Sequence, residues 1–216
     1  MEFDVRLCAR PGCGLRYSTA AGDPTGARCP RCRAPAELII SAYHRLAVQT
    51  QLAPAPGPDL EVLLDNIRSA WNVGSMLRSA DGAGVRAIHL CGVSALPTNP
   101  KVAKTSLGAE HSMAWRYAPD AVAVAREQLE MGMRLWALEG GERAVSLFDL
   151  AGEFQGPPIL LAVGNELTGV DPGLLDLCER VVCLPMQGMK ESLNVAVAFG
   201  IAVYTIRFAA NGTVSG

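Results

Sequence analysis

From residue 59 onward, short apolar runs alternate with longer segments of helical pattern. The apolar runs lie at 61–64, 86–91, 134–138, 159–163 and 181–184. The helical patterns lie at 73–83, 120–131, 172–178 and 192–208. Strands that are apolar on both faces are typical of a sheet that is covered on both sides. Their alternation with helices predicts an α/β domain built around a parallel sheet.

The residues before this domain have a different composition. Residues 1–40 are rich in Cys, Gly, Pro and Arg, and residues 53–58 read Ala-Pro-Ala-Pro-Gly-Pro, which excludes a helix or a central strand. We therefore expect a small domain at 1–40, a linker at 41–58, the α/β domain at 59–210 and a tail at 211–216. Residues 94–112 are expected to form a long loop, and loops of that length are usually functional or mobile.

Hydropathy and charge limit the possible partners. The longest apolar run, 193–206, is shorter than the roughly 20 residues that span a bilayer, and the N-terminus lacks a signal-peptide pattern. A cytoplasmic protein with no membrane partner is therefore expected. Residues 1–52 carry seven Arg against four acidic residues, whereas the remainder carries 12 Lys and Arg against 17 acidic residues. An acidic body alone suits nucleic acid poorly, because phosphate contacts supply much of that affinity.

Four cysteines crowd the first 32 residues. Cys8 and Cys13 form one close pair, and Cys29 and Cys32 form a second pair after an insert of hairpin length. Two such pairs suit a tetrahedral zinc site, and a segment with so few large apolar side chains could hardly fold without a metal. The alternative is a pair of disulfides. The expected structure is a small zinc ribbon.

Three glycine-containing segments lie against apolar runs. They are Asn72-Val-Gly74-Ser-Met-Leu-Arg78, Gly164-Asn165-Glu166-Leu-Thr-Gly169, and residues 184–195, Leu-Pro-Met-Gln-Gly-Met-Lys-Glu-Ser-Leu-Asn-Val. Each is interpreted as a turn, in which glycine lets the backbone approach a ligand closely. Asn72 and Ser192 are candidate helix N-caps. In this order the three segments resemble the SpoU/TrmH family of SPOUT RNA ribose 2′-O-methyltransferases, over roughly residues 59–208.

The resemblance implies methyl transfer from S-adenosylmethionine to a ribose 2′-OH of tRNA or rRNA. Arg78 would lie beside the target ribose and activate its hydroxyl by charge and hydrogen bonding, because a guanidinium with a pKa above about 12 is not ordinarily a base. Asn72 would assist Arg78, and Glu166 would hold the guanidinium in place. The catalytic residues implied are Arg78, Asn72, Glu166, Ser192 and Asn194.

The resemblance also implies the cofactor site and the topology. Backbone groups around Leu184 and Met186 would bind the adenine, and Gly164 would let the backbone curve beneath the methyl donor. The cofactor-binding residues implied are Val163, Gly164, Asn165, Leu184, Met186, Gly188, Ser192, Leu193 and Asn194. The binding loops would come from a C-terminal trefoil knot, and two copies would pair through this region as a homodimer. A Rossmann Gly-x-Gly-x-x-Gly turn between a strand and a helix is absent.

Two other functions stay open. One is a non-catalytic module that binds RNA or the ribosome on the same scaffold, and the other is a SPOUT methyltransferase that modifies a base. Ribbons in RNA enzymes usually bind substrate, so the N-terminal arginines would contact RNA or, alternatively, form a solvated surface. These arginines are Arg10, Arg16, Arg28, Arg31 and Arg33.

Overall fold

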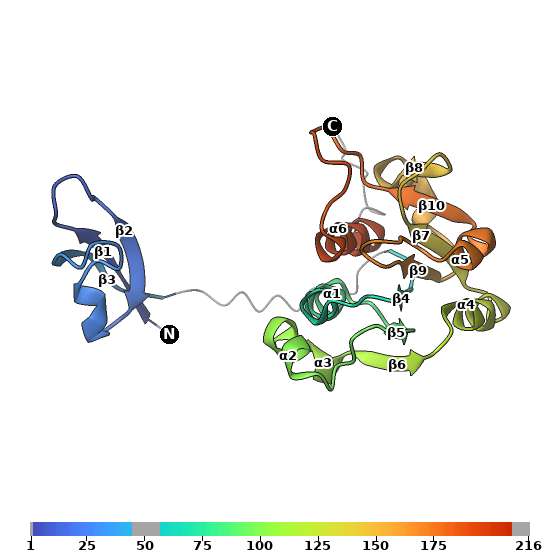
Figure 1. The fold of residues 1–216 in the computed structure, drawn as a ribbon, viewed down its shortest axis with the longest axis horizontal. Coiled ribbons are helices and arrows are strands. Elements are labelled where there is room, and N and C mark those ends of the chain that lie inside the picture. The colour runs from blue at the N-terminus through green and yellow to red at the C-terminus, as the bar shows by residue number, and fades with distance from the viewer. Residues whose placement is uncertain (1, 45–56, 209–216) are drawn as a thin grey trace. The chain divides into compact units, whose positions relative to one another are not determined.

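A computed structural model of the chain describes residues 2–44 and 57–208 (Figure 1). The chain divides into two compact units, Met1–Leu52 and Ala53–Gly216, and each is described by itself. Residues 45–56 of the expected linker and the expected tail at 211–216 lie outside the described residues.

The first unit is a three-stranded antiparallel sheet. Its strands β1 (Glu2–Cys8), β2 (Arg16–Ala20) and β3 (Ala36–His44) lie in the order β2-β1-β3. The 3-10 helix η1 (Pro24–Ala27) begins where Asp23 accepts the Thr25 N–H at 2.8 Å, and the Tyr17 hydroxyl donates to the Gly26 carbonyl at 2.7 Å. β3 runs past the expected domain boundary at residue 40, so 41–44 belong to this sheet and not to a linker.

The second unit confirms the predicted parallel sheet. Its seven strands pair in parallel in the order β6-β5-β4-β9-β7-β10-β8. They are β4 (Leu60–Asp65), β5 (Ala87–Cys91), β6 (Ala114–Ala118), β7 (Arg134–Leu138), β8 (Ala144–Ser146), β9 (Ile159–Val163) and β10 (Arg180–Cys183). The helices are α1 (Ala70–Ala83), α2 (Pro100–Ser106), α3 (Ala109–Ser112), α4 (Ala121–Glu130), α5 (Pro172–Leu177), α6 (Val195–Phe208) and the 3-10 helix η2 (Leu147–Phe154).

Helices cover both faces of this sheet, with α1 and α6 on one side and α4 and α5 on the other (Figure 1). The side chains of β4 show why both faces need cover. Leu60, Val62 and Leu64 point into the core beneath α1 and α6, whereas Leu63 points into the core beneath α4 and α5. Alternate side chains of one strand thus enter opposite cores, which accounts for the consecutive apolar residues at 62–64.

The expected long loop at 94–112 is wrong, because it contains α2 and α3. The signal was an Asn-Pro start: the Asn99 side chain accepts the Lys101 N–H at 3.0 Å and Pro100 occupies the first turn. Leu107 and Gly108, both with positive φ, then separate the two helices. The sequence analysis also missed β6, β8 and η2.

The two predicted helix caps are also wrong. α1 begins at Ala70 with Ser69 as its N-cap, so the segment 72–78 is helix and not a turn. α6 begins at Val195, and Asn194 rather than Ser192 accepts the first free N–H groups, from Ala196 at 2.9 Å and Val197 at 3.4 Å.

Among the helices of residues 2–44 and 57–208, none combines the length and apolarity that crossing a membrane requires. The trefoil knot stays a prediction.

Candidate active site

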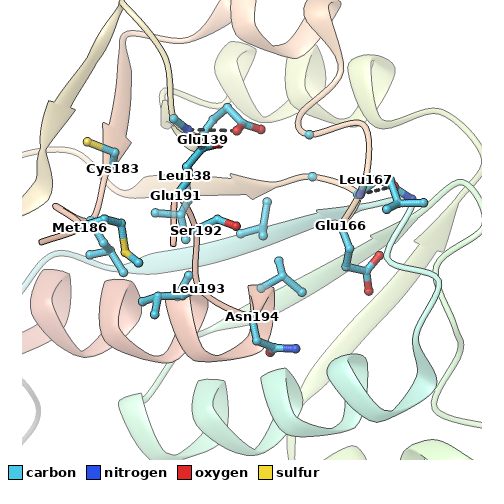
Figure 2. Close-up of a pocket in the computed structure, with 18 residues that line it drawn as sticks. Leu138, Glu139, Glu166, Leu167, Cys183, Met186, Glu191, Ser192, Leu193 and Asn194 are labelled. Carbon is cyan, nitrogen blue, oxygen red and sulfur yellow. Dashed lines mark hydrogen bonds between the residues drawn. The ribbon is translucent and has the colours of Figure 1, made fainter. Parts of the chain in front are cut away.

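A cavity of about 410 Å³ opens at the carboxyl ends of β7, β9 and β10. Three loops build it: residues 138–140 after β7, residues 163–169 after β9, and residues 183–195 between β10 and α6. In Figure 2, Glu166 and Asn194 lie toward one end of the cavity, and Met186 and Cys183 lie toward the other. This is the edge of the sheet at which ligands of open α/β folds bind.

Eight of the nine expected cofactor residues line this cavity, and Gly188 does not. The eight are Val163, Gly164, Asn165, Leu184, Met186, Ser192, Leu193 and Asn194. The segments 163–165 and 184–194, about 20 positions apart in the chain, therefore line the same cavity. Of the predicted catalytic residues, Glu166, Ser192 and Asn194 lie on the cavity wall.

The loop after β9 is closed by its own backbone. Asn165 and Gly169 exchange N–H···O hydrogen bonds of 3.0 and 2.9 Å, and the Asn165 side chain donates to the Asn66 carbonyl at 2.7 Å. A Cβ on Gly164 would lie 2.2 Å from the Gly169 carbonyl oxygen. Glycine is therefore required at 164 by the close approach of the returning chain.

Glu139, which the sequence analysis did not select, fastens this loop to β7. Its carboxylate accepts the Val170 N–H at 2.8 Å and the Gly140 N–H at 3.0 Å, and it lines the cavity. A signal for it existed, because Glu139 directly follows an apolar run at the same edge of the sheet as Gly164. Glu191 also lines the cavity and was missed.

One chain of hydrogen bonds joins the three segments. The Asn194 side-chain oxygen accepts backbone N–H groups of α6, so its Nδ2 is left to donate, and it donates to Asn72 Oδ1 at 3.3 Å. Asn72 Nδ2 in turn donates to Glu166 Oε1 at 2.9 Å. The helix start fixes the amide orientation of Asn194, and that orientation determines the direction of every later bond in the chain.

Glu166 is held as an anion by these contacts. Burial raises the pKa of its carboxyl, but hydrogen bonds from the Asn72 amide and from the N–H groups of Glu166, Ser69 and Arg68 outweigh burial, and the pKa is lowered. The predicted partner, Arg78, is not among these groups. Within the described residues, Glu166 makes no ion pair with Arg78.

Arg78 lies apart from the other expected catalytic residues. It is exposed on α1, does not line the cavity, and stands six positions after Asn72, which is about 240° around the helix. Asn72 faces Asn194 and Glu166, so the side chain of Arg78 leaves α1 in another direction. The structure therefore brings Asn72, Glu166 and Asn194 together and leaves Arg78 outside the cavity of its own chain.

The four N-terminal cysteines converge in the first unit. All four thiols are free, and their sulfur atoms lie within 4.8 Å of one another, with Cys8–Cys32 at 3.5 Å and Cys13–Cys29 at 3.9 Å. Sulfur atoms around a tetrahedral zinc are separated by about 3.8 Å, given Zn–S bonds of about 2.3 Å. Gly12 and Gly14 take positive φ on either side of Cys13, which lets the backbone turn tightly around its thiol. The donor set and spacing fit zinc.

Comparison with known proteins assigns the second unit to a family. The SpoU rRNA Methylase family matches residues 59–204, and the first unit lies outside that match. The 23S rRNA (guanosine-2'-O-)-methyltransferase of Ralstonia nicotianae is 32% identical over 148 residues, which are 68% of this chain and 58% of that protein. This chain thus spans about three fifths of the length of that relative.

Two solved structures are similar. An AdoMet-bound rRNA methyltransferase from Sinorhizobium meliloti superposes with a TM-score of 0.65 at 25% identity, covering 72% of this chain and 58% of that one. The TrmH/SpoU tRNA modifying enzyme of A. aeolicus superposes with a TM-score of 0.62 at 25% identity, covering 71% of this chain and 76% of that one. With the parallel sheet, the cavity at its carboxyl edge and a family match over most of the second unit, the chain belongs to the SpoU rRNA Methylase family.

Proposed function

We propose that residues 59–208 bind S-adenosylmethionine in the cavity and methylate a ribose 2′-OH of tRNA or rRNA. The hydrogen-bond chain Glu166–Asn72–Asn194 carries this proposal. It joins one residue from each of the three family segments at one end of the cavity, where a reacting group would sit. Nothing in the packing of the sheet itself requires that chain.

The charge of the cavity supports a cationic ligand. Glu139, Glu166 and Glu191 line it, and no Lys, Arg or His side chain of the described residues does. A sulfonium is a cation, so this wall complements the reactive end of S-adenosylmethionine. The volume of about 410 Å³ falls in the usual range for small-molecule sites, about 300–1,000 Å³.

The apolar part of the cavity lining suits the adenine. Leu138, Val163, Leu184, Met186 and Leu193 line the cavity alongside the carboxylates. Backbone groups near Leu184 and Met186 would then read the edge of the base. When bound there, S-adenosylmethionine would supply an activated methyl group to the ribose oxygen and leave as S-adenosylhomocysteine, with the hydroxyl proton passing to solvent. The protein's main contribution to such a step is alignment.

A second copy of the chain would complete the site. α6 exposes a row of apolar side chains to solvent, Val197 at 52%, Ile201 at 37%, Tyr204 at 46% and Phe208 at 39%. Exposed apolar patches of this kind mark interfaces. We infer a homodimer through this α6 face, in which Arg78 of each copy reaches the cavity of the partner. That arrangement accounts for a catalytic arginine that lies outside the cavity of its own chain.

Labelled methyl transfer to total RNA tests the activity. Arg78→Ala is expected to abolish transfer, with S-adenosylmethionine affinity by calorimetry and thermal stability close to wild type. Resistance of the adjacent phosphodiester to alkali identifies the product, because only 2′-O-methylation blocks cleavage. Labelled RNA that is fully cleaved by alkali would instead assign a base methyltransferase. Binding of RNA without transfer or S-adenosylmethionine binding would assign the non-catalytic module.

Mixing two inactive variants tests the shared site. Arg78→Ala and Asn194→Ala proteins are refolded together, so that some dimers contain one cavity with both an intact wall and an intact partner arginine. Recovery of about a quarter of wild-type activity is expected from random pairing into one competent site per mixed dimer. No recovery, in a mixture shown by mass spectrometry to contain mixed dimers, would place Arg78 in its own chain's reaction.

For the first unit we propose a structural zinc bound by Cys8, Cys13, Cys29 and Cys32 in a ribbon that helps to hold RNA. The sulfur separations and the free thiols support the metal. Arg10, Arg16, Arg31 and Arg33 are exposed, which leaves them available to phosphates. Metal analysis of the purified protein tests the first statement, and RNA affinity of residues 53–216 against the whole chain tests the second.

A further inference from the structure

Several cations of the second unit have no acidic partner within the part of the chain that the structure describes, and three of them lie on neighbouring elements. Arg86, Arg116, Arg134 and Arg180 are each bound to a glutamate. Arg68, Lys101 and Lys104, by contrast, make no ion pair with an acidic side chain of the described residues. They lie in the turn before α1 and on α2, two elements that pack closely together, since a Cβ on Gly74 of α1 would lie 2.3 Å from the Val102 carbonyl oxygen of α2.

A continuous series of contacts connects these cations to the cavity. The Glu166 carboxylate, on the cavity wall, accepts a hydrogen bond from the Asn72 amide at 2.9 Å. Asn72 directly follows Trp71, whose carbonyl accepts the Thr105 hydroxyl at 3.0 Å. Lys104 Nζ lies 5.9 Å from the centroid of the Trp71 ring. The path from the reacting end of the cavity to α2 therefore passes over Trp71.

Trp71 is a large aromatic residue that stays half-exposed beside the candidate site. Its side chain is 50% exposed, although it directly precedes Asn72 in the hydrogen-bond chain of the site. The indole lines a groove between α1 and α6, whose α6 wall belongs to the proposed homodimer face, and the Lys104 ammonium lies over the indole. A half-exposed indole with adjacent cations offers the two groups that bind single-stranded nucleic acid, an aromatic plane for a base and positive charge for phosphates.

We propose that Arg68, Trp71, Lys101 and Lys104 form a ledge that binds the RNA strand next to the target nucleotide. A neighbouring base stacks on Trp71 in place of the Lys104 ammonium, which then contacts a phosphate together with Lys101. The strand must be unpaired here, because a base in a duplex has no free face. This inference rests on the proposed function, because the strand is taken to run from the ledge toward a target ribose near Glu166. It also gives an acidic domain a local site for phosphates, because Arg68, Lys101 and Lys104 lie on neighbouring elements.

Anisotropy of a fluorescein-labelled single-stranded RNA of mixed sequence tests the ledge directly, without requiring turnover. Trp71→Ala in the full chain is expected to weaken binding about 5- to 150-fold, as for loss of one stacking platform, and Trp71→Phe is expected to retain most of the affinity. Lys104→Gln is expected to lower the slope of log affinity against log salt by about 0.7, the value for one phosphate contact in a single strand. Arg126→Gln, which removes an exposed cation of α4 on the other face of the sheet, is the matched control.

The outcomes separate this inference from the proposed function. RNA affinity unchanged in both Trp71→Ala and Lys104→Gln would overturn the ledge, whatever the methyl-transfer assay shows. Weakened RNA binding by these variants with unchanged binding by Arg126→Gln supports the ledge, even if the wild-type protein transfers no methyl group. Dissociation of the Trp71→Ala dimer in light scattering, with RNA binding intact, would assign Trp71 to a contact between copies and would also overturn it. Thermal melting of each variant establishes that it is folded.

Discussion

The side-chain amides of Asn72 and Asn194, 122 positions apart, are hydrogen-bonded to each other at 3.3 Å. Asn72 stands in the first turn of α1, and Asn194 caps α6. Their bond joins the starts of two helices that lie on the same face of the sheet, and Glu166 extends it to the loop after β9. The position of each group at the cavity thus depends on the other two.

Asn72→Asp replaces the donor that faces Glu166 with a second carboxylate. Two carboxylates at this separation cannot both ionise freely, so the variant is expected to lose about 1–3 kcal/mol of stability at pH 7.5 and most of its methyl transfer. Protonation of the pair should relieve the repulsion, so the loss in the free energy of unfolding should shrink as the pH falls toward 5. Urea unfolding at both pH values measures this. Asn72→Ala removes the donor without adding charge, and an equal pH dependence in the two variants would contradict the contact.

Gly164→Ala should distort the loop after β9. The added Cβ meets only backbone atoms, the Gly169 carbonyl and the Val170 nitrogen at 2.2–2.3 Å, so no side chain can move aside to make room. We expect a loss of about 1–3 kcal/mol in the free energy of unfolding. S-adenosylmethionine affinity, by calorimetry, should fall about tenfold or more.

Gly188→Ala is the matched control for this substitution. Gly188 belongs to the loop between β10 and α6, but its added Cβ meets no atom within 4 Å and it does not line the cavity. Stability and cofactor affinity should both stay near wild type. A cofactor defect as large as that of Gly164→Ala would show that Gly188 contacts the ligand, as the family resemblance implies.

His89 belongs to a buried charge network on the face of the sheet opposite α1. Its Nε2 lies 2.6 Å from a carboxylate oxygen of Glu61, which also binds Arg86, and its Nδ1 accepts the Arg116 Nε–H at 2.7 Å. Because Nδ1 is an acceptor, Nε2 carries the proton and donates a hydrogen bond to Glu61, and the ring is neutral. Burial, assisted by the Arg116 charge and opposed by Glu61, lowers the pKa of His89 below its usual 6.5.

This lowered pKa predicts a loss of stability in mild acid. Between the lowered value and 6.5, the unfolded chain binds a proton that the folded protein excludes, so the free energy of unfolding rises with pH through this window. The contribution is complete above pH 6.5 and is lost as the pH falls, with a slope of at most about 1.4 kcal/mol per pH unit. Urea titrations from pH 5 to 7.5 should show the slope. It should disappear in His89→Gln and persist in His111→Gln, whose imidazole is 83% exposed.

Removing the proposed zinc should unfold the first unit alone. Within residues 2–44 the buried apolar side chains are Cys8 and Cys29, so the sheet has no core apart from the thiol cluster. Cys29→Ser, or a strong chelator, is expected to abolish zinc content and to expose residues 2–44 to protease, with the melting of the second unit unchanged. Cys178→Ser should retain zinc, because that thiol lies in the second unit and donates to the Leu174 carbonyl. A protease-resistant first unit without metal would contradict the assignment.

The sequence by itself determined the class of fold, and its resemblance to the family indicated two of the three segments that line the cavity. Strand and helix periodicities are local, so β7 and β9 were predicted with their observed bounds. Boundaries that depend on one hydrogen bond were wrong, as at Ser69 and Asn194, because several polar residues near a helix start can compete to cap it. The Cys cluster was also predictable, because its four ligands come in two pairs that are each close in sequence.

Only the tertiary structure decided which side chains meet. The bonds from Asn72 to Glu166 and Asn194 span 94 and 122 positions, and they exist because β9 lies beside β4 and because α1 and α6 cover the same face. Strand order is a property of the whole sheet, which local patterns do not encode. For the same reason the sequence could not reveal that Glu139 fastens the β9 loop, or that Arg78 leaves α1 away from its own cavity.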